Sequence, residues 1–291
     1  MTKLLWELGE GELPRLHPRL AMFDVDGTLR GRNGEISAAV RGAIASLQRS
    51  GCKVGLATGR PLFSAGQIIR SLRLDAPSIL MSGALSVNAD LSPLAANPLL
   101  QDEVRAIVSA CRSLNVDVEL YSDDRYFAEK QSELLQIHWG YYEAPAERID
   151  DLLVLAGGLF PGVKRVVKAH LIVTEHEEPR VLEQLKLLLP GLRFSVAHGA
   201  AHPELSFVNV TSSAARPAEM LEHIAAGLGV PLSEVVSFGD GESDIPVMTR
   251  AGIGIAMANA KPVVHAAADY ITRSVDEDGV SYAVDLLLRE R

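Results

Sequence analysis

From residue 20 onward, short apolar runs alternate with stretches whose apolar residues recur at helical spacing. The runs Leu20–Phe23, Lys53–Ala57 and Ile79–Met81 predict buried strands, since each is short, apolar and bounded by polar residues. The stretches that follow the first two runs predict helices, because their apolar residues fall on one face at 3.6-residue spacing. Strands and helices in this alternation predict an α/β fold with a doubly wound parallel sheet and right-handed crossovers.

The middle of the chain breaks this alternation and predicts an insert. It shows short strand-like segments at 116–121, 126–128, 165–174 and 192–196, with helical stretches at 101–114, 130–138 and 177–189. After about residue 205 the earlier pattern resumes, with a helix at 217–228, strands at 234–238 and 252–257 and a last helix at 278–289. We therefore predict an extension at 1–19, a core of 20–86 and 207–291, and an α+β insert at 87–206, about 120 residues and well within domain size.

Two carboxylates follow the first predicted strand. Asp24 and Asp26 are two positions apart, so in extended chain their side chains share one side. The carboxyl ends of strands are where open α/β sheets bind ligands, and two charges this close require a cation or a shared proton. Phosphoryl transfer suits such a pair, because one carboxylate can attack phosphorus while Mg²⁺ offsets the charge and the other handles the leaving-group proton. The alternative is an acidic turn without chemistry.

More polar groups follow the other strands. Thr58 and Gly59 end the second strand and precede a helix, where backbone N–H groups and the helix dipole favour an anion. A capping threonine is the alternative for Thr58. Asp240 and Asp244 follow the strand at 234–238 and open another helix. Carboxylates at such a helix start make most sense around a hard cation, so we predict a Mg²⁺ site between the two acidic clusters.

Composition narrows the class of partner. The chain has 291 residues, 47% of them hydrophobic and 22% charged, which is ordinary for a globular protein and enough for two domains. The formal charge of −9 argues against nucleic acid or an anionic membrane and favours a small molecule. Cys52 and Cys111 alone make neither a disulfide framework nor a cysteine zinc site, and no signal-peptide or membrane-spanning pattern occurs. We expect a cytoplasmic protein with reduced thiols.

The insert contains one basic cluster, Lys164, Arg165 and Lys168. A contact with substrate, through Lys164 and Lys168, is one interpretation. A solvated loop and strand face is the favoured alternative, because lysine and arginine side chains are mostly exposed.

Three histidines of the insert are candidate metal ligands. His198 and His202 are four residues apart, but a glycine and a proline beside them predict a turn rather than one helix face, so the metal interpretation is set aside. His170 lies in an apolar strand-like run and is expected to be a packed residue rather than a ligand.

The motifs, in their order along the chain, resemble those of one family. DVDGT (24–28), ATGR (57–60), GDGESD (239–244), AGIGIAMANA (251–260) and ADYIT with DEDGV (268–280) resemble the haloacid dehalogenase (HAD) superfamily of phosphohydrolases. More narrowly, they resemble the Cof-type members of subclass IIB, in which a C2B cap is inserted between the second and third motifs. The resemblance covers about residues 20 to 290, strongly in the two core segments and weakly in the cap. It implies a Rossmann-like core with an inserted α+β C2B cap.

The resemblance also implies roles for particular residues. Asp24 would be the nucleophile that forms an aspartyl-phosphate, and Asp26 the general acid and base whose backbone carbonyl also meets Mg²⁺. Thr58 matches the residue that holds the phosphoryl group. Asp240 matches an acidic Mg²⁺ ligand, and Asp244 would complete the metal site directly or through water.

The third motif departs from the family pattern. Relatives carry a lysine at the start of the helix that here begins near Pro217, and alignment back from Leu228-Gly229 places it at Pro217 or, with a slip of one residue, at Arg216. No lysine lies between Lys186 and Lys261. Arg216 is therefore the candidate cation for phosphate, although a guanidinium does not replace the point charge of lysine. The alternative is a solvent-exposed arginine before a helix.

The favoured function is a Mg²⁺-dependent phosphatase that hydrolyses a small phosphorylated metabolite, with sugar phosphates as the preferred class. One alternative is a phosphomutase similar to phosphomannomutases, which would need the basic cluster of the insert to hold a second phosphate. Another is a phospholigand-binding relative in which catalysis is weak or lost because the lysine is missing.

Overall fold

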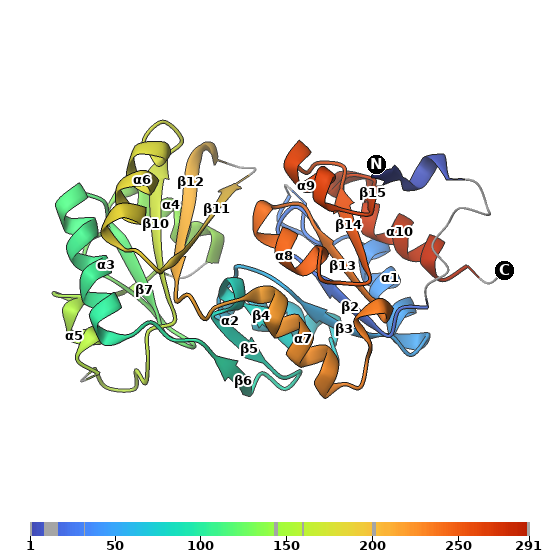
Figure 1. The fold of residues 1–291 in the computed structure, drawn as a ribbon, viewed down its shortest axis with the longest axis horizontal. Helices are drawn as coiled ribbons and strands as arrows, with labels where there is room; N and C mark the ends of the chain where they lie inside the picture. Colours follow the sequence, from blue (N-terminus) through green and yellow to red (C-terminus); the bar gives the residue numbers. More distant parts are fainter. Residues whose placement is uncertain are drawn as a thin grey trace.

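The computed structural model describes residues 2–8, 17–31, 33–142, 145–158, 160–199 and 202–289. Figure 1 shows an elongated molecule with two lobes, and both chain ends lie in the same lobe. No helix within these residues combines the length and the apolar character needed to cross a bilayer.

Six parallel strands form the central sheet of the lobe that contains the termini. Their order is β1-β15-β14-β13-β2-β3, and every neighbouring pair is parallel. The strands are β1 (Lys3–Leu4), β2 (Leu20–Phe23), β3 (Lys53–Leu56), β13 (Val235–Gly239), β14 (Ile253–Met257) and β15 (Tyr270–Thr272). A strand buried on both faces needs a continuous apolar run, and β2 is fully buried along its length.

Helices cover both faces of this sheet. They are α1 (Ala38–Arg49), α2 (Leu62–Leu72), α7 (Pro217–Gly227), α8 (Ile245–Met248), α9 (Pro262–Ala267) and α10 (Gly279–Leu287). Alternate side chains of β2 point to opposite faces of the sheet, as in any strand. Ala21 and Phe23 pack in a cluster with residues of α1 and α10, whereas Leu20 and Met22 pack with residues of α7. The predicted doubly wound α/β core is therefore confirmed.

The predicted third strand of the parallel sheet has different partners. β4 (Ser78–Leu80) pairs antiparallel with β5 (Leu85–Val87), which pairs with β6 (Pro93–Ala96), and these three strands form a sheet of their own. β4 is linked to the end of β3 by an isolated parallel bridge between Ala57 and Ile79 and by a hydrogen bond from the N–H of Leu56 to the Ser78 hydroxyl at 3.0 Å. The reason is a tight turn after β4, where three successive residues, 81 to 83, have positive φ and return the chain along itself.

The other lobe is a mostly antiparallel sheet with helices. Its strand order is β11-β12-β10-β7-β8-β9, and only β8 and β9 are parallel. The strands are β7 (Val118–Tyr121), β8 (Tyr126–Ala128), β9 (Glu147–Arg148), β10 (Lys168–Thr174), β11 (Arg193–Gly199) and β12 (His202–Thr211). One face packs against α3 (Gln101–Leu114), α5 (Leu153–Ala156) and α6 (Glu178–Leu188). The other face packs against α4 (Glu133–Tyr142), whose apolar residues share a cluster with the core.

The mixed α+β character of the insert is as predicted, but the domain boundaries stay a prediction. β1 lies in the predicted extension and adds an edge strand to the central sheet. β6 lies within the predicted insert yet pairs with β5, and β12 runs across the predicted boundary at 206/207. Short 3-10 helices complete the chain: η1 (Leu5–Glu7), η2 (Met81–Gly83), η3 (Leu232–Glu234), η4 (Glu242–Asp244) and η5 (Val275–Glu277).

Candidate active site

Two neighbouring strands of the central sheet bring the two acidic clusters together. β2 and β13 are parallel and in register, with Phe23 opposite Phe238 and their rings stacked at 4.7 Å between centroids. Asp24 follows β2 directly, and its N–H donates to the carbonyl of Phe238 at 3.0 Å. Asp240 follows β13 at the same level. The carboxyl ends of parallel strands share one edge, so two acidic segments far apart in sequence meet there.

Oxygens of Asp24, Asp240 and Asp244 form one group in which the possible ligand atoms all lie within 4.8 Å of one another. Glycines make this approach possible. Gly27 has φ +87°, and a Cβ there would lie 2.2 Å from Asp240 Oδ2. At Gly239 a Cβ would lie 2.4 Å from that of Asp244. Real atoms cannot approach so closely, so both positions require glycine.

Hydrogen bonds orient the carboxylates. Asp244 Oδ2 accepts the backbone N–H of Asp240 at 3.1 Å and that of Gly241 at 2.9 Å. Asp240 Oδ1 accepts the hydroxyl of Thr28 at 3.1 Å, and Asp240 Oδ2 accepts the side-chain amide of Asn259 at 3.3 Å. Thr28 and Asn259 lie in the DVDGT and AGIGIAMANA motifs, but sequence reasoning gave them no role. The sequence indicated a function for these two residues only through their positions in those motifs.

Burial and mutual repulsion raise the pKa values of all three carboxyl groups. Burial raises the pKa of Asp24 well above 3.8, and the charges of Asp244, Asp240 and Asp26 raise it further. Burial also raises the pKa values of Asp240 and Asp244 to about 7. The charge of Asp244 is a second cause of the raised pKa of Asp240. Three such groups are costly as anions unless a cation neutralises them. An all-oxygen donor set of this kind fits Mg²⁺, which keeps waters as further ligands.

Asp26 lies beside the cluster and is held by Arg60. The Arg60 guanidinium donates from Nε to Asp26 Oδ2 at 2.6 Å and from Nη2 to Oδ1 at 2.7 Å. The side chain of Arg60 is only 7% exposed and that of Asp26 is 56% exposed. Although burial opposes its charge, the hydrogen bonds and charge of Asp26 raise the pKa of Arg60. Arg60 is the last residue of the ATGR motif, but its bidentate pairing with Asp26 could not be predicted from the sequence.

The loop after β3 meets the other lobe. Thr58 is buried, and its hydroxyl oxygen accepts the N–H of Arg60 at 3.3 Å. The carbonyl of Gly59 accepts a hydrogen bond from Lys168 Nζ on β10 at 3.3 Å. Lys168 is 1% exposed, its ammonium lies 4.5 Å from the ring centroid of Tyr121, and burial lowers its pKa to about 8. A cation of the insert therefore reaches the predicted phosphate loop.

The other members of the basic cluster do not reach this loop. Lys164 is exposed, and Arg165 makes a bidentate pair with Asp123, with a shortest distance of 2.7 Å. The interpretation of a solvated face fits these two residues, whereas Lys168 is the exception.

Arg216 does not join the carboxylates. Pro217 is the first residue of α7, and Arg216 caps the helix with an extended backbone. Its Nη1 donates to Glu219 at 2.6 Å, its Nε donates to the carbonyl of Ser213 at 3.2 Å, and its side chain is 55% exposed. Pro217 itself packs on the backbone of Gly83, where a Cβ would lie 2.9 Å from the proline nitrogen. In this structure Arg216 is thus an exposed arginine before a helix, as in the alternative, and its role as a phosphate cation stays a prediction.

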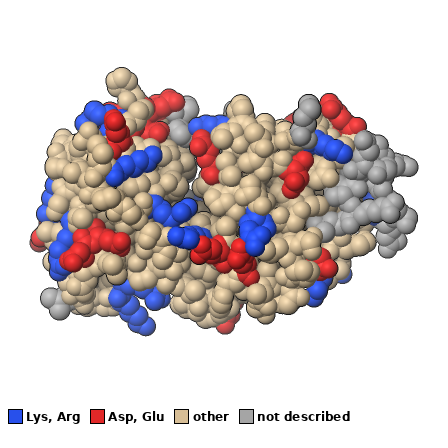
Figure 2. Space-filling model, viewed as in Figure 1, with Lys and Arg blue, Asp and Glu red and all other residues tan. Residues whose placement is uncertain are grey.

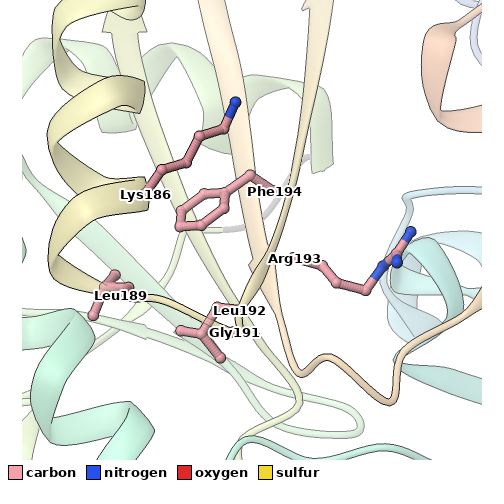
Figure 3. A pocket seen from close by; sticks show the side chains of 6 residues that line it. All are labelled: Lys186, Leu189, Gly191, Leu192, Arg193 and Phe194. Atoms are coloured by element: carbon pink, nitrogen blue, oxygen red, sulfur yellow. The ribbon is translucent and has the colours of Figure 1, made fainter.

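Gly199 and His202 pair across the antiparallel strands β11 and β12, and the predicted turn between them, at residues 200 and 201, lies outside the described residues. An open pocket of about 360 Å³ lies on the insert, lined by Lys186, Leu189, Gly191, Leu192, Arg193 and Phe194 (Figure 3). It contains no carboxylate, so it lacks the groups that phosphoryl chemistry requires.

On the face in Figure 2, acidic and basic side chains are interspersed, unlike the single-sign surface that a polyanion partner favours.

Comparisons with known proteins identify the family of the chain. A family model described as haloacid dehalogenase-like hydrolase matches residues 21–284. The chain is 28% identical to stress response protein YhaX of Bacillus subtilis (strain 168), over 91% of each chain. It is 26% identical to an HMP-PP phosphatase of Yersinia pseudotuberculosis serotype I (strain IP32953), over 84% of this chain and 85% of that protein. The solved structure of BT4131, described as an HAD subclass IIB sugar phosphatase, is 27% identical, with a TM-score of 0.77 over 92% of this chain and 98% of the other.

Proposed function

The chain belongs to the haloacid dehalogenase-like hydrolases and is a phosphatase of that family, and on this premise we propose that it is a Mg²⁺-dependent enzyme that hydrolyses a sugar phosphate through an aspartyl-phosphate on Asp24. The observation that carries the proposal is the group of three buried carboxylates at the carboxyl edge of the sheet. Nothing else in the described residues sets so many anions where a cation and a phosphoryl group would relieve their repulsion.

Asp24 is the attacking group because it is the most buried of the two carboxylates in DVDGT and lies at the end of β2. Its oxygen attacks phosphorus, the bond from phosphorus to the leaving oxygen breaks, and that oxygen takes a proton from Asp26. A water then gives its proton to Asp26 and attacks the phosphorus. Phosphate leaves, and the carboxylate of Asp24 is regenerated.

Asp26 exchanges protons with the leaving group and with water, for which its exposed side chain is suited. Because Arg60 occupies both of its oxygens, the guanidinium must release Asp26 before the carboxyl group can carry a proton. Release would free Arg60 to hold a phosphoryl oxygen, since a guanidinium binds phosphate in the same bidentate way. Arg60 thus has two alternative anionic partners.

Asp24, Asp240 and Asp244, with the backbone carbonyl of Asp26, would hold the Mg²⁺, which would offset negative charge on the phosphoryl oxygens. Thr28 and Asn259 keep Asp240 oriented for this role. Thr58 and the backbone at Gly59 would bind the phosphoryl group at the start of α2. Arg60 and Lys168 would supply the positive charge that relatives obtain from lysine of the third motif.

Sugar phosphates are proposed as substrates because BT4131, over nearly the whole chain, is described as a sugar phosphatase. The phosphatase from Yersinia shows that other small phosphorylated molecules belong in the test. We also propose a cytoplasmic location, because Cys52 and Cys111 are both free and buried. A mutase is not favoured, since Arg165 is engaged by Asp123 and Lys164 is exposed.

The test is release of inorganic phosphate from a panel of sugar phosphates, HMP-PP and an aryl phosphate, with Mg²⁺ or EDTA. Wild type is compared with Asp24→Asn and with Asp285→Asn, a matched change at an exposed position of α10. We expect release that needs Mg²⁺ and is lost by a factor of about 10³ or more in Asp24→Asn only. Release that survives in Asp24→Asn or in EDTA contradicts the mechanism. Absence of release from every substrate, with phosphate analogues still bound, would instead indicate the phospholigand-binding alternative.

A further inference from the structure

A second cluster of titratable groups lies in the insert, apart from the aspartates. Glu119 on β7, His170 on β10 and His138 on α4 are all buried and form a group whose possible ligand atoms lie within 4.8 Å of one another. Glu119 and His170 are directly opposite in the antiparallel pair of β7 and β10, so the sheet register itself sets them side by side. α4 brings His138 onto the same face.

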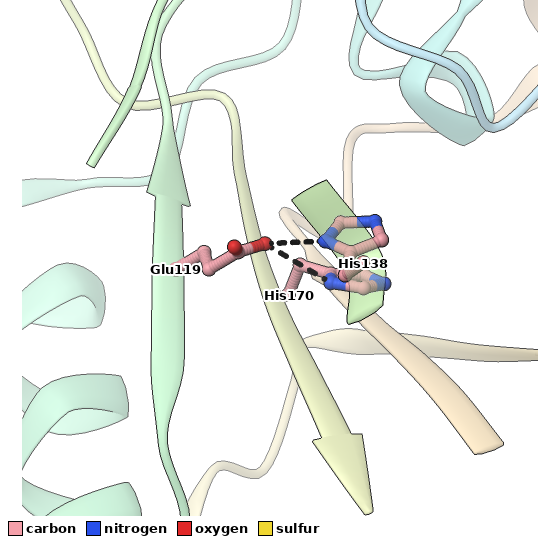
Figure 4. A group of neighbouring side chains, drawn as sticks. All are labelled: Glu119, His138 and His170. Atoms are coloured by element: carbon pink, nitrogen blue, oxygen red, sulfur yellow. Dashed lines mark hydrogen bonds and ion pairs between the residues drawn. The ribbon is translucent and has the colours of Figure 1, made fainter. Parts of the chain in front are cut away.

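The donor atoms converge on one point. Figure 4 shows both histidine rings with Nδ1 toward the same carboxylate oxygen of Glu119. His138 Nδ1 is 2.8 Å and His170 Nδ1 is 3.4 Å from Glu119 Oε2. Ligands about 2.1 Å from one ion, at right or tetrahedral angles, are about 3.0–3.4 Å apart. The His170 distance lies at the upper end of that range, and the His138 distance lies just below it.

The surroundings hold the carboxylate in place. Trp139 Nε1 donates to Glu119 Oε1 at 2.7 Å, and the Tyr121 hydroxyl donates to Oε2 at 2.8 Å. Such outer hydrogen bonds orient the ligands of metal sites. The His170 Nδ1 atom, by contrast, is fully buried and has no hydrogen-bond partner among the described residues. A buried nitrogen without a partner is costly, and an ion between the three side chains would give it one.

We propose that Glu119, His138 and His170 form a binding site for a divalent transition metal ion of the Zn²⁺ type, separate from the aspartate site. Two imidazoles and one carboxylate suit such an ion, whereas Mg²⁺ prefers oxygen alone. The rings now stack at 4.2 Å between centroids with 23° between planes. Because an imidazole lone pair lies in the ring plane, both rings turn out of this stack when the ion binds.

The ion would fix α4 against the sheet of the insert. α4 already contacts this face through apolar side chains, through the hydrogen bond from Trp139 to Glu119 and through the tilted ring pair of His138 and Phe207. A site made of β7, β10 and α4 joins residues distant in sequence, so its binding free energy adds to the stability of the folded insert.

The test measures zinc directly. The full chain is stripped with a chelator, incubated with Zn²⁺ in excess Mg²⁺, separated from free metal by gel filtration and assayed for zinc by mass spectrometry. We expect about one zinc per chain in wild type and in Asp240→Asn, which removes a ligand of the other site. His170→Ala and Glu119→Gln should lower zinc affinity on the order of 100-fold, whereas His223→Ala, at an exposed position of α7, should not.

Two results would overturn the proposal: zinc that disappears in Asp240→Asn, or zinc that remains in His170→Ala. Folding is checked separately, since a variant that fails to fold would also lose the ion. Zn²⁺ should therefore raise the urea midpoint of the Asp240→Asn chain, in which the insert is unaltered, and Co²⁺ in its place should give the visible absorption of a nitrogen-ligated ion. No rise in the midpoint refutes the site without use of any variant in the cluster.

Discussion

Replacement of Asp244 by asparagine should stabilise the metal-free protein, although it removes a residue of the proposed site. Asp244 is buried, and one of its oxygens accepts two backbone N–H groups, which the amide oxygen of asparagine can accept equally well. The change therefore deletes a charge and keeps the hydrogen bonds. What is lost is a carboxylate whose ionisation the folded chain resists.

The magnitude follows from the pKa. Burial raises the pKa of Asp244 from 3.8 to about 7, so between these values the folded chain holds a proton that the unfolded chain has released. Stability of the wild type therefore falls as the pH rises through this window and stays low above it. Linkage gives a cost of about 4 kcal/mol at pH 8 and about 2 kcal/mol at pH 5. The variant escapes this cost, so its advantage should shrink as the pH falls.

The assay is urea unfolding followed by circular dichroism in EDTA, at pH 5 and pH 8, with Asp285→Asn as the exposed control. With Mg²⁺ at about 100 times its Kd, the wild type should gain about 2.7 kcal/mol and Asp244→Asn much less. Two results would refute the reasoning: a variant no more stable than wild type at pH 8 without metal, or an advantage that does not change with pH. The first would mean that water or a bound cation already solvates the carboxylate.

Three further predictions concern the same region. Gly27→Ala should destabilise the protein by about 2 kcal/mol or more in urea unfolding and should weaken Mg²⁺ binding. The control is Gly51→Ala, where φ is +89° but nothing lies within 4 Å of the new Cβ, and it should cost only about 1 kcal/mol. Equal costs for the two variants would show that the clash at Gly27 is absent. In phosphate-release kinetics, Arg60→Ala should lower kcat/KM by about 100-fold and Arg216→Ala by less than about twofold. A larger loss in Arg216→Ala than in Arg60→Ala would identify Arg216 as the phosphate cation. Because burial lowers the pKa of Lys168 to about 8, the KM of the wild type should rise above pH 8 as the ammonium loses its proton. Lys168→Met should have a high KM at every pH. A rise in the KM of this variant parallel to that of the wild type would assign the effect to another group.

The core was predictable from the sequence because each of its strands obeys a local rule. β2 and β13 are fully buried, so apolar runs mark them, and the acidic residues that follow them must meet because parallel strands share their carboxyl edge. β4 shows the limit of this reasoning. Its apolar run predicted a strand, but its partners depend on a turn at 81–83 that a local pattern does not reveal.

The charges around the site were harder to predict. Whether an arginine pairs with Asp26 or with Glu219 depends on the direction of its side chain, which a single sequence does not contain. Lys168 was grouped with its basic neighbours by distance along the chain, yet strand alternation and burial separate it from them. Glu119 gave no signal, since one acidic residue in a short strand resembles an exposed edge position.

The two clusters treat buried carboxylates in opposite ways. Glu119 receives hydrogen bonds from Trp139 and Tyr121. Although burial would raise its pKa, the charges of the two histidines and the hydrogen bond of His138 hold the pKa well below its ordinary value. The aspartates at the sheet edge have too few donors for their number, and their pKa values are raised. More donors around Asp24 would stabilise its anion and so lower its reactivity toward phosphorus. The folded state therefore retains the electrostatic cost of its buried carboxylates at the proposed catalytic site, and it offsets that cost with donors at Glu119.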